Sequence, residues 1–498
     1  MALSSASPRW QHLLQNLSLL ALALVFTPYC TTATLLTSLL SRRSRRTCRT
    51  PSRTPCRAPR RILVTGVGMT KGLAIARAFY QQGHHVVAAD FEPNGIPVCG
   101  RFSNAVSIFY RLPQESINEA GDSSYVTALL SIVRKEKIDL WVSCSGVASA
   151  LEDAKAAEAV QQETDCKAIQ FGVEMTATLH EKYSFNENTR RLGLNTPKTH
   201  LIVSIDDALD ILHSDENTDS TKYIMKPVGV DDTARADMTL LPRPLASKTR
   251  SHIARLNPTP TRPFVLQQYI QGPEYCTHSI VIRGKVKLFT ACPSADMLMH
   301  YQSLPTDSPL FQVMFEYTKT YAEKMGAEMT GHFSLDFLVD ETAGAKGTSK
   351  LEERIYPIEC NPRAHTAVVL FGHDSEKMVD AYLHLLDSKA DSENRKTEVV
   401  FPSSQTPYYW LGHDIVTRLI LPGLSLLTFR SSLASTYRHL RELHDHIHNW
   451  KDGTFEVWDP WPFWWLYCVY WPGRLVVAIV RGEWWSRCNV STGKMFIC

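Results

Sequence analysis

The sequence has no acidic residue before Asp90, which sets its first 89 positions apart from the rest of the chain. Nine arginines fall between Arg42 and Arg61, so the basic excess belongs to this segment, although the whole chain carries a formal charge of only +3. A protein that reads nucleic acid usually spreads Lys and Arg over its folded domain with aromatic residues between them. Nucleic acid is therefore not an expected partner, and a membrane surface fits the basic segment better.

C-x-x-C pairs, His/Cys clusters at zinc spacing and internal repeats are also lacking, although the chain has 12 cysteines. Without such spacings the sequence predicts neither a structural metal site nor a disulfide framework. The 498 residues are 44% hydrophobic and 21% charged. A chain of this length and composition can bury two or three globular cores, which excludes a disordered protein and a small disulfide-stapled scaffold.

A long apolar run from Leu13 to Leu40 is followed at once by the basic cluster Arg42–Arg46. About 20 apolar residues suffice to cross a bilayer, and positive charges after the run place the folded body on the cytosolic side. We interpret residues 1–46 as an uncleaved membrane anchor and residues 47–60 as a basic linker. The alternative is a mitochondrial transit peptide, which is also rich in Arg and poor in acids but is amphipathic.

Two domains with different patterns follow the linker. An apolar strand at Arg61–Thr65, a glycine-bearing loop at Gly66–Gly72, a helix through Phe79 and a second strand at His85–Asp90 are typical of a parallel sheet. Residues 61–180 are therefore predicted to form a Rossmann-like domain. Residues 181–390 read instead as strands joined by short turns, which predicts an α+β domain. The expected fold class is α/β and α+β.

Residues 400–498 form an aromatic-rich C-terminal region. The segment from Trp458 to Trp471 holds five tryptophans and two tyrosines. Tryptophan and tyrosine concentrate where a protein meets lipid headgroups, so association with a membrane is one interpretation. An aromatic cap on the protein core is the other, and the sequence does not choose between them.

The clearest candidate site combines two acids on neighbouring predicted strands. Asp336 lies in the strand His332–Val339, and Glu359, Asn361 and Arg363 follow the strand that starts at Ile355. Magnesium that holds a nucleotide triphosphate prefers hard oxygen ligands, which Asp336, Glu359 and Asn361 would supply. Arg363 beside the metal would neutralise charge on a phosphoryl group in transit. A polar turn that happens to contain Asn-Pro is the structural alternative.

Two lysines and one strand end extend this candidate site. Lys182 opens the α+β domain, and Lys226 ends the predicted strand that starts at Tyr223. Further along, a strand runs through Gln268, Tyr269 and Ile270 into a turn that ends at Glu274. Backbone groups around Tyr269 and Ile270 would read an adenine edge, and Glu274 would accept the ribose hydroxyl groups.

In this order the motifs resemble the ATP-grasp superfamily: a lysine, a Lys-Pro strand, a glycine-bearing loop, an adenine hinge with an acid, a metal acid, and Glu-x-Asn-Pro-Arg. The resemblance runs from Lys182 to about Leu386. With the Rossmann-like half before it, the chain looks like the branch related to carbamoyl-phosphate synthase large chains and is similar to mycosporine-glycine synthases. The resemblance implies ATP and Mg²⁺ as cofactors, with roles for these residues: Lys182 and Lys226 on the phosphates, Gln268, Tyr269, Ile270 and Glu274 around the nucleoside, Asp336, Glu359 and Asn361 on magnesium, and Arg363 on the transferred group.

Two departures from the family pattern stand out. The loop from Pro227 to Arg235 has one glycine where many relatives have several, and Gln268 stands where an acid is common. The resemblance implies an ATP-dependent ligase that activates a carboxylate or enolate acceptor and joins it to an amine, although an ATP-grasp kinase fits the same motifs.

Two other classes remain open. One is an NAD(P)-dependent reductase that uses the Gly66–Gly72 loop with Asp90, although this loop is one residue too long for the G-x-G-x-x-G spacing. The other is a nucleotide-binding membrane protein without catalysis, which would leave the intact Asp336, Glu359, Asn361 and Arg363 unexplained. The sequence names neither the acceptor, nor the amine, nor the oligomeric state.

Overall fold

A computed structural model describes residues 7–45, 58–113, 123–146, 149–214, 221–228, 237–294, 299–341, 350–387 and 398–497, with the side chains of residues 41–45 left aside. The predicted linker up to residue 57 and the predicted phosphate-covering loop from Gly229 to Arg235 lie outside the described residues.

The N-terminal domain is a parallel five-stranded sheet in the order β3-β2-β1-β4-β5, as the Rossmann-like prediction requires. Period-two alternation sends Ile62 and Val64 to one face of β1 and Leu63 to the other, and all three are fully buried. The elements are β1 Arg61–Thr65, α2 Thr70–Gln81, β2 His85–Asp90, η1 Pro93–Gly95, η2 Cys99–Phe102, β3 Ile108–Arg111, α3 Ser124–Glu136, β4 Leu140–Val142, α4 Ala150–Glu163 and β5 Lys167–Ile169.

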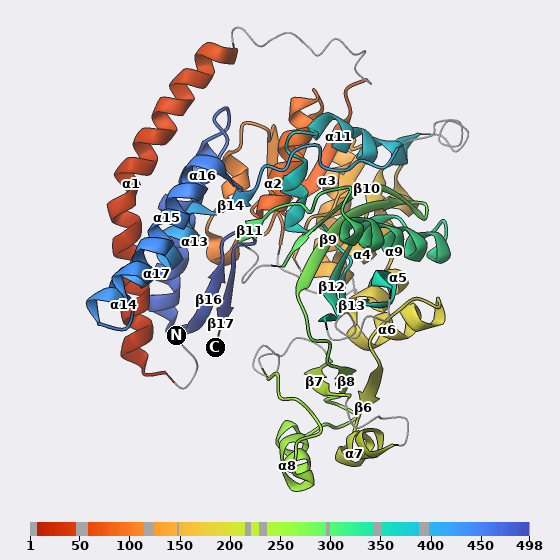
Figure 1. Cartoon of the computed structure of the whole chain (residues 1–498). Coiled ribbons are helices and arrows are strands. Elements are labelled where there is room, and N and C mark those ends of the chain that lie inside the picture. Colours follow the sequence, from red (N-terminus) through yellow and green to blue (C-terminus); the bar gives the residue numbers. More distant parts are fainter. Residues whose placement is uncertain are drawn as a thin grey trace.

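The next part of the chain forms two lobes, each built on an antiparallel sheet. The small lobe, at the bottom of Figure 1, has the strand order β6-β8-β7 with helices α7 and α8. Its elements are β6 Thr199–Ile202, α7 Ile205–His213, β7 Tyr223–Pro227, α8 Ala246–Leu256 and β8 Phe264–Gln268.

The large lobe has the strand order β10-β9-β12-β13. The sequence placed Glu359 and Asn361 after a strand, whereas β13 includes both, so their side chains are fixed by strand pairing. The elements are α5 Val173–His180, α6 Lys182–Arg191, β9 Glu274–Ile282, β10 Lys285–Pro293, α9 Pro309–Met325, β12 Gly331–Val339, η6 Leu351–Glu353, β13 Ile355–Asn361, η7 Thr366–Phe371, α11 Ser375–Leu383 and η8 His384–Leu386.

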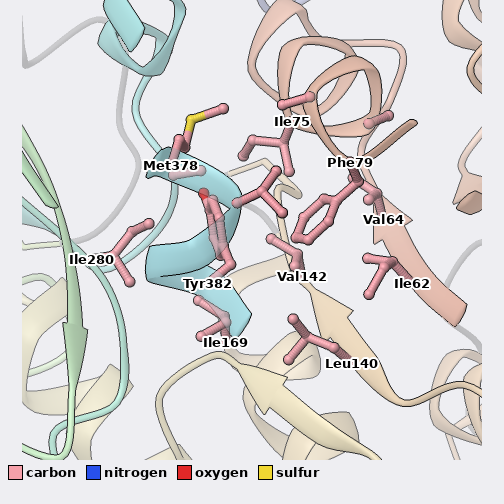
Figure 2. Close-up of a cluster of buried hydrophobic side chains, with 14 of the residues drawn as sticks. Ile62, Val64, Ile75, Phe79, Leu140, Val142, Ile169, Ile280, Met378 and Tyr382 are labelled. Carbon is pink, nitrogen blue, oxygen red and sulfur yellow. The ribbon is translucent and has the colours of Figure 1, made fainter. Parts of the chain in front are cut away.

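A shared hydrophobic cluster joins the N-terminal sheet to the large lobe. Figure 2 shows this cluster, with Ile62 on the side of the N-terminal sheet and Ile280 of β9 on the side of the large lobe. Between them, the ring of Phe79 lies 5.5 Å from that of Tyr382 of α11. Fully burying one such side chain contributes about 1.5–3 kcal/mol, so this cluster holds the two parts in a fixed relation.

The C-terminal region starts with short strands that extend from the large lobe and continues as helices. A three-stranded sheet has the order β11-β14-β15, and the last two strands, β16 and β17, form a two-stranded sheet. Strand β11, His300–Tyr301, comes from the preceding part of the chain. The elements of the C-terminal region are β14 Tyr408–Tyr409, α13 Leu411–Asp414, η9 Ile415–Ile420, α14 Leu421–Leu427, α15 Leu433–Asn449, β15 Lys451–Asp452, α16 Trp461–Trp465, η10 Leu466–Tyr470, α17 Trp471–Arg481, β16 Trp485–Asn489 and β17 Lys494–Ile497.

Inward-facing groups of the C-terminal region cap the N-terminal domain. Asp459 is fully buried and accepts hydrogen bonds from Arg77 Nε at 2.8 Å, Ser103 Oγ at 2.6 Å and the Asn104 amide at 2.7 Å. The ring of Trp465 stacks on Phe102 with centroids 3.7 Å apart. The cap interpretation therefore describes the inner side of this region.

The N-terminal helix α1, Arg9–Arg45, is long and apolar and lies along the C-terminal helices at the left of Figure 1. By length and composition, two helices of the described chain are able to cross a membrane: Arg9–Leu40 and Trp461–Arg481.

Candidate functional site

The acidic residues of the site face each other on paired strands of the large lobe. In the antiparallel register of β12 and β13, Asp336 lies opposite Glu359. Asn361 Nδ2 donates to Asp336 Oδ2 at 2.9 Å, and Arg363 Nη2 donates to Asn361 Oδ1 at 2.6 Å. The structure thus brings together the four residues that the Glu-x-Asn-Pro-Arg motif and the preceding strand predicted.

Both predicted lysines point into the same space. Lys182, the first residue of α6, donates from Nζ to Glu359 Oε2 at 2.7 Å. Lys226 on β7 of the small lobe donates to Gln267 Oε1 at 2.9 Å. Burial and the nearby charge of Lys182 lower the pKa of Lys226 to about 8, while Glu359 and Glu274 oppose this shift. The two lysines therefore make one cationic patch that spans both lobes.

The electrostatics of this space favour an added cation and an added anion. Burial and the charges of Glu359 and Glu274 raise the pKa of Asp336 well above its ordinary value. A divalent cation would relieve that carboxylate repulsion. Arg363 is half-buried, and its Nε, which is shielded from solvent, has no hydrogen-bond partner among the described residues. A guanidinium with an unused, shielded donor is suited to a phosphoryl oxygen.

The predicted adenine hinge lies at the end of β8. The Tyr269 amide donates to Lys222 O at 2.7 Å, so a base at this position would meet the carbonyl of Tyr269 rather than its N–H. Gln268 bonds the backbone of Lys198 through both its amide and its side chain. Ile270 is buried, whereas Glu274 is exposed and accepts a hydrogen bond from Ser294 Oγ at 2.8 Å. The nucleoside roles of these four residues stay a prediction.

Sequence reasoning missed a buried lysine that joins the N-terminal domain to the site. Lys71 in the first turn of α2 is 2% exposed and donates from Nζ to Ser145 O at 3.0 Å and to Ala364 O at 2.9 Å. Ala364 directly follows Arg363, so Lys71 holds the backbone beside the guanidinium in place. Burial and the charge of Arg363 lower the pKa of Lys71 to about 7. The only feature of the sequence that pointed to Lys71 was its place within the Gly66–Gly72 loop.

Replacing Lys71 by Met should change how stability depends on pH. An unfolded lysine titrates near 10.5 and folded Lys71 near 7, so between these values the unfolded chain binds more protons. The free energy of unfolding of the wild type should therefore rise with pH relative to Lys71→Met, by up to about 1.4 kcal/mol per pH unit. Urea unfolding of both proteins from pH 7 to 10 measures this difference. The exposed control Lys350→Met should show none, and parallel curves for wild type and Lys71→Met would contradict the burial argument.

Two side chains of types that often act in catalysis, Cys144 and His332, are packed inside the protein. Burial raises the pKa of the Cys144 thiol to about 12, which argues against a nucleophile. His332 is 1% exposed, and its Nε2 lies 2.9 Å from the hydroxyl group of Tyr382. Burial and the neighbouring His278 lower the pKa of His332 well below its ordinary value.

The glycine loop of the N-terminal domain leaves little space for a dinucleotide. Asp90 accepts a hydrogen bond from the Gly68 amide at 2.6 Å, and a Cβ on Gly68 would lie 2.8 Å from Val98. The Thr70 amide, at the start of α2 where a pyrophosphate would bind, donates to Ser491 O at 2.8 Å. Trp410 donates to the Thr70 hydroxyl group at 3.1 Å. Protein groups thus occupy the position that the reductase alternative requires.

One polar cluster outside this site was not predicted from the sequence. His300, Asp414 and His446 bring their ligand atoms within 4.8 Å of one another, a grouping that could hold a metal ion. His300 and His446 lie 2.8 and 2.5 Å from the two oxygens of the fully buried Asp414. Although burial acts to raise it, these hydrogen bonds hold the pKa of Asp414 below its ordinary value. The three residues are 114 and 32 positions apart, too far for a spacing motif.

Comparison with known proteins places the chain by its fold. No family model matches the sequence, and no curated protein matches it. A solved N5-carboxyaminoimidazole ribonucleotide synthetase in complex with ADP aligns with a TM-score of 0.50 and 11% identity, over 80% of this chain and 99% of that one. An L-amino acid ligase from Bacillus licheniformis aligns with a TM-score of 0.45 and 14% identity over 70% and 78% of the two chains. A biotin carboxylase from Campylobacter jejuni aligns with a TM-score of 0.47 and 15% identity, over 67% of this chain and 73% of that one. The alignment with the first of these structures and the strand orders above show that the chain has the ATP-grasp fold with a parallel, Rossmann-like N-terminal sheet.

Proposed function

We propose that the chain is an ATP- and Mg²⁺-dependent ligase that phosphorylates a carboxylate or enolate oxygen of an acceptor and joins the acceptor to an amine or amino acid. The continuous set of contacts from Lys182 through Glu359, Asp336 and Asn361 to Arg363 carries this proposal. The presence of ADP in the synthetase structure of the same fold supports a nucleotide at this place. A cyclohexenone acceptor, as in mycosporine-glycine synthases, rests on the family resemblance alone.

The residues present suit both magnesium and a triphosphate. Two carboxylates and an amide oxygen form a hard-oxygen donor set for Mg²⁺, and burial together with the neighbouring carboxylates raises the pKa of Asp336 above its ordinary value. Lys182, Lys226 and Arg363 provide the cationic groups for phosphates. When bound, Mg²⁺ would neutralise triphosphate charge.

The chain's own part in the reaction is to orient the reactants and to stabilise charge. The acceptor oxygen would bond to the γ-phosphorus as the bond to the β,γ-bridging oxygen breaks, and ADP leaves. Arg363, fixed by Asn361 and held next to the Lys71-bonded Ala364, would neutralise the moving phosphoryl group. The amine nitrogen would then attack the activated carbon, phosphate would leave with its oxygen, and the amine proton would pass to solvent. Closing the lobes would exclude water from the hydrolysable phosphate.

Release of ADP and phosphate tests this function directly. The full chain in detergent or vesicles, supplied with Mg²⁺ and ATP, is assayed against a panel of carboxylate and enolone acceptors, each with and without amino acids. We expect phosphate release only when a particular acceptor and an amine are both present. ADP formation that leaves a stable phosphorylated acceptor, with no need for an amine, would instead identify a kinase. The full chain is used because α1 packs on the C-terminal region.

A further inference from the structure

The long helix α1 buries several polar side chains against the protein and leaves many large apolar side chains exposed. His12 and Asn16 are 1% exposed, whereas Leu24 is 72% and Tyr29 is 70% exposed. A helix on a water-soluble protein has the opposite arrangement, because its apolar stripe faces the core. The exposed large apolar residues of α1 are Trp10, Leu13, Leu14, Leu17, Leu24, Val25, Tyr29, Leu35, Leu36, Leu39 and Leu40. This outer face is suited to a hydrocarbon environment.

The inner face of α1 is fixed to the C-terminal region along much of its length. Trp485 Nε1 donates to Asn16 Oδ1 at 2.9 Å, and Trp464 Nε1 donates to Thr31 Oγ1 at 2.8 Å. At 1.5 Å per residue these two contacts lie about 22 Å apart along the helix. Leu19 and Leu20 pack between them against the cluster that includes α17. Helix α1 is therefore a bound part of the folded protein.

This attachment conflicts with a helix that crosses a bilayer. The helix that runs from α16 to α17 packs on the N-terminal domain, where Trp465 Nε1 donates to Pro97 O at 2.8 Å. If α1 crossed the bilayer, it would carry Arg474 and Arg481 of α17 towards the hydrocarbon. Each charge in the centre of a membrane costs about 2.5–3.5 kcal/mol or more. A helix that lies in the plane of the membrane keeps its apolar face in lipid and the protein outside.

A second exposed apolar group lies at the turn between α14 and α15. Leu427, Phe429 and Leu433 are 75%, 96% and 72% exposed. The residues between Asp414 and Glu442 include no acid and four arginines, of which Arg418 is ion-paired with Glu442 while Arg430, Arg438 and Arg441 are exposed. Apolar side chains flanked by arginines are the pattern of an interfacial segment that binds anionic headgroups. Figure 1 shows α14 at the same edge of the molecule as α1, away from the small lobe.

We infer that these two parts form one lipid-facing surface, made by the outer face of α1 together with Leu427, Phe429 and Leu433. The surface lies in the plane of a bilayer that contains anionic lipid, and α1 does not cross that bilayer. The inference is independent of the proposed function.

Vesicle flotation tests whether this surface binds lipid. The full chain is mixed with phosphatidylcholine vesicles, with or without phosphatidylserine, and compared with the variant Leu24→Asp/Leu427→Asp/Phe429→Asp. We expect the bound fraction of the variant to fall at least about tenfold, since each substitution removes apolar contact and adds a charge at the interface. The wild type should bind more strongly with phosphatidylserine, and this gain should shrink in high salt.

The matched control is Leu201→Asp/Met238→Asp/Leu245→Asp, which makes the same chemical change at exposed apolar residues of the small lobe and its connections. It should float like the wild type, and both variants should keep the wild-type unfolding temperature because all six side chains are exposed. Equal flotation of both variants would overturn the inference. So would a wild type that does not float but forms dimers by light scattering, because a second copy would then cover the surface.

Protease access to two tags distinguishes an in-plane helix from a crossing helix. The full chain is produced in sealed microsomal vesicles with one epitope tag at each end. An in-plane α1 leaves both ends on the same side, so protease should remove both tags without detergent. Removal of the C-terminal tag alone would show that α1 crosses the bilayer and would overturn the inference.

Discussion

Replacing Glu359 by Gln is expected to lower acceptor-dependent ADP release by at least about 100-fold, as for loss of a main electrostatic group in an active site. The carboxylate faces Asp336 across β12 and β13 and bonds Lys182 at 2.7 Å. An amide keeps the shape of the side chain but removes a negative metal ligand. Calorimetric titration with ATP, with and without Mg²⁺, checks the binding step without knowledge of the acceptor, and the gain in affinity from Mg²⁺ should nearly disappear.

The Glu359→Gln substitution also removes the ion-pair partner of Lys182, so a second variant is needed. Asp336→Asn changes the opposite carboxylate, whose hydrogen-bond partner among the described site residues is Asn361 rather than Lys182. Both variants should lose the gain in ATP affinity that Mg²⁺ gives. The control Glu353→Gln changes an exposed acid just before β13 and should keep that gain. If Glu359→Gln and Asp336→Asn both retain wild-type binding and turnover, the magnesium site is wrongly assigned.

The local part of this site could be predicted because its residues lie on strands with a clear pattern. The predicted strands His332–Val339 and from Ile355, with the Asn-Pro turn, placed Asp336, Glu359 and Asn361 near one another. Lys71 could not be predicted in the same way, since its contact with Ala364 joins positions 293 apart and a single lysine in a loop resembles a surface residue. The same limit applies to Lys226 and Gln267, which meet only when β7 and β8 pair.

The N-terminal helix shows a different limit of sequence reasoning. A hydropathy average over Leu13–Leu40 counts every side chain and therefore indicates a spanning segment. In the structure, Asn16 and Thr31 bond the protein on one face, beside Leu19 and Leu20, while Leu24, Leu36 and Leu40 are exposed. The partners of this polar face are tryptophans more than 400 positions away, so no local pattern could reveal it.

Replacing Asp459 by Ala is expected to lower the free energy of unfolding by about 3–5 kcal/mol, the usual cost of leaving one charge of a buried ion pair alone. Arg77 would remain buried after losing its carboxylate partner at 2.8 Å, and Ser103 and the Asn104 amide would lose an acceptor. Chemical denaturation of the full chain in detergent measures the loss. The exposed Asp445→Ala on α15 should leave the unfolding midpoint unchanged, and an unchanged midpoint for Asp459→Ala would contradict the argument.

The double variant Arg77→Met/Asp459→Ala separates the ion pair from general packing at this contact. Removing both charges leaves neither unpaired, so the double variant should be destabilised by less than the sum of the two single variants. The two residues are 382 positions apart in sequence but in contact in space. Additive losses would mean that they act independently despite this contact. Coupling would show that Arg77 and Asp459 stabilise the contact between the C-terminal region and the N-terminal domain as a pair. Because Thr70 and Trp410 meet at the same interface, next to Lys71, loss of the cap should also loosen the backbone beside Arg363.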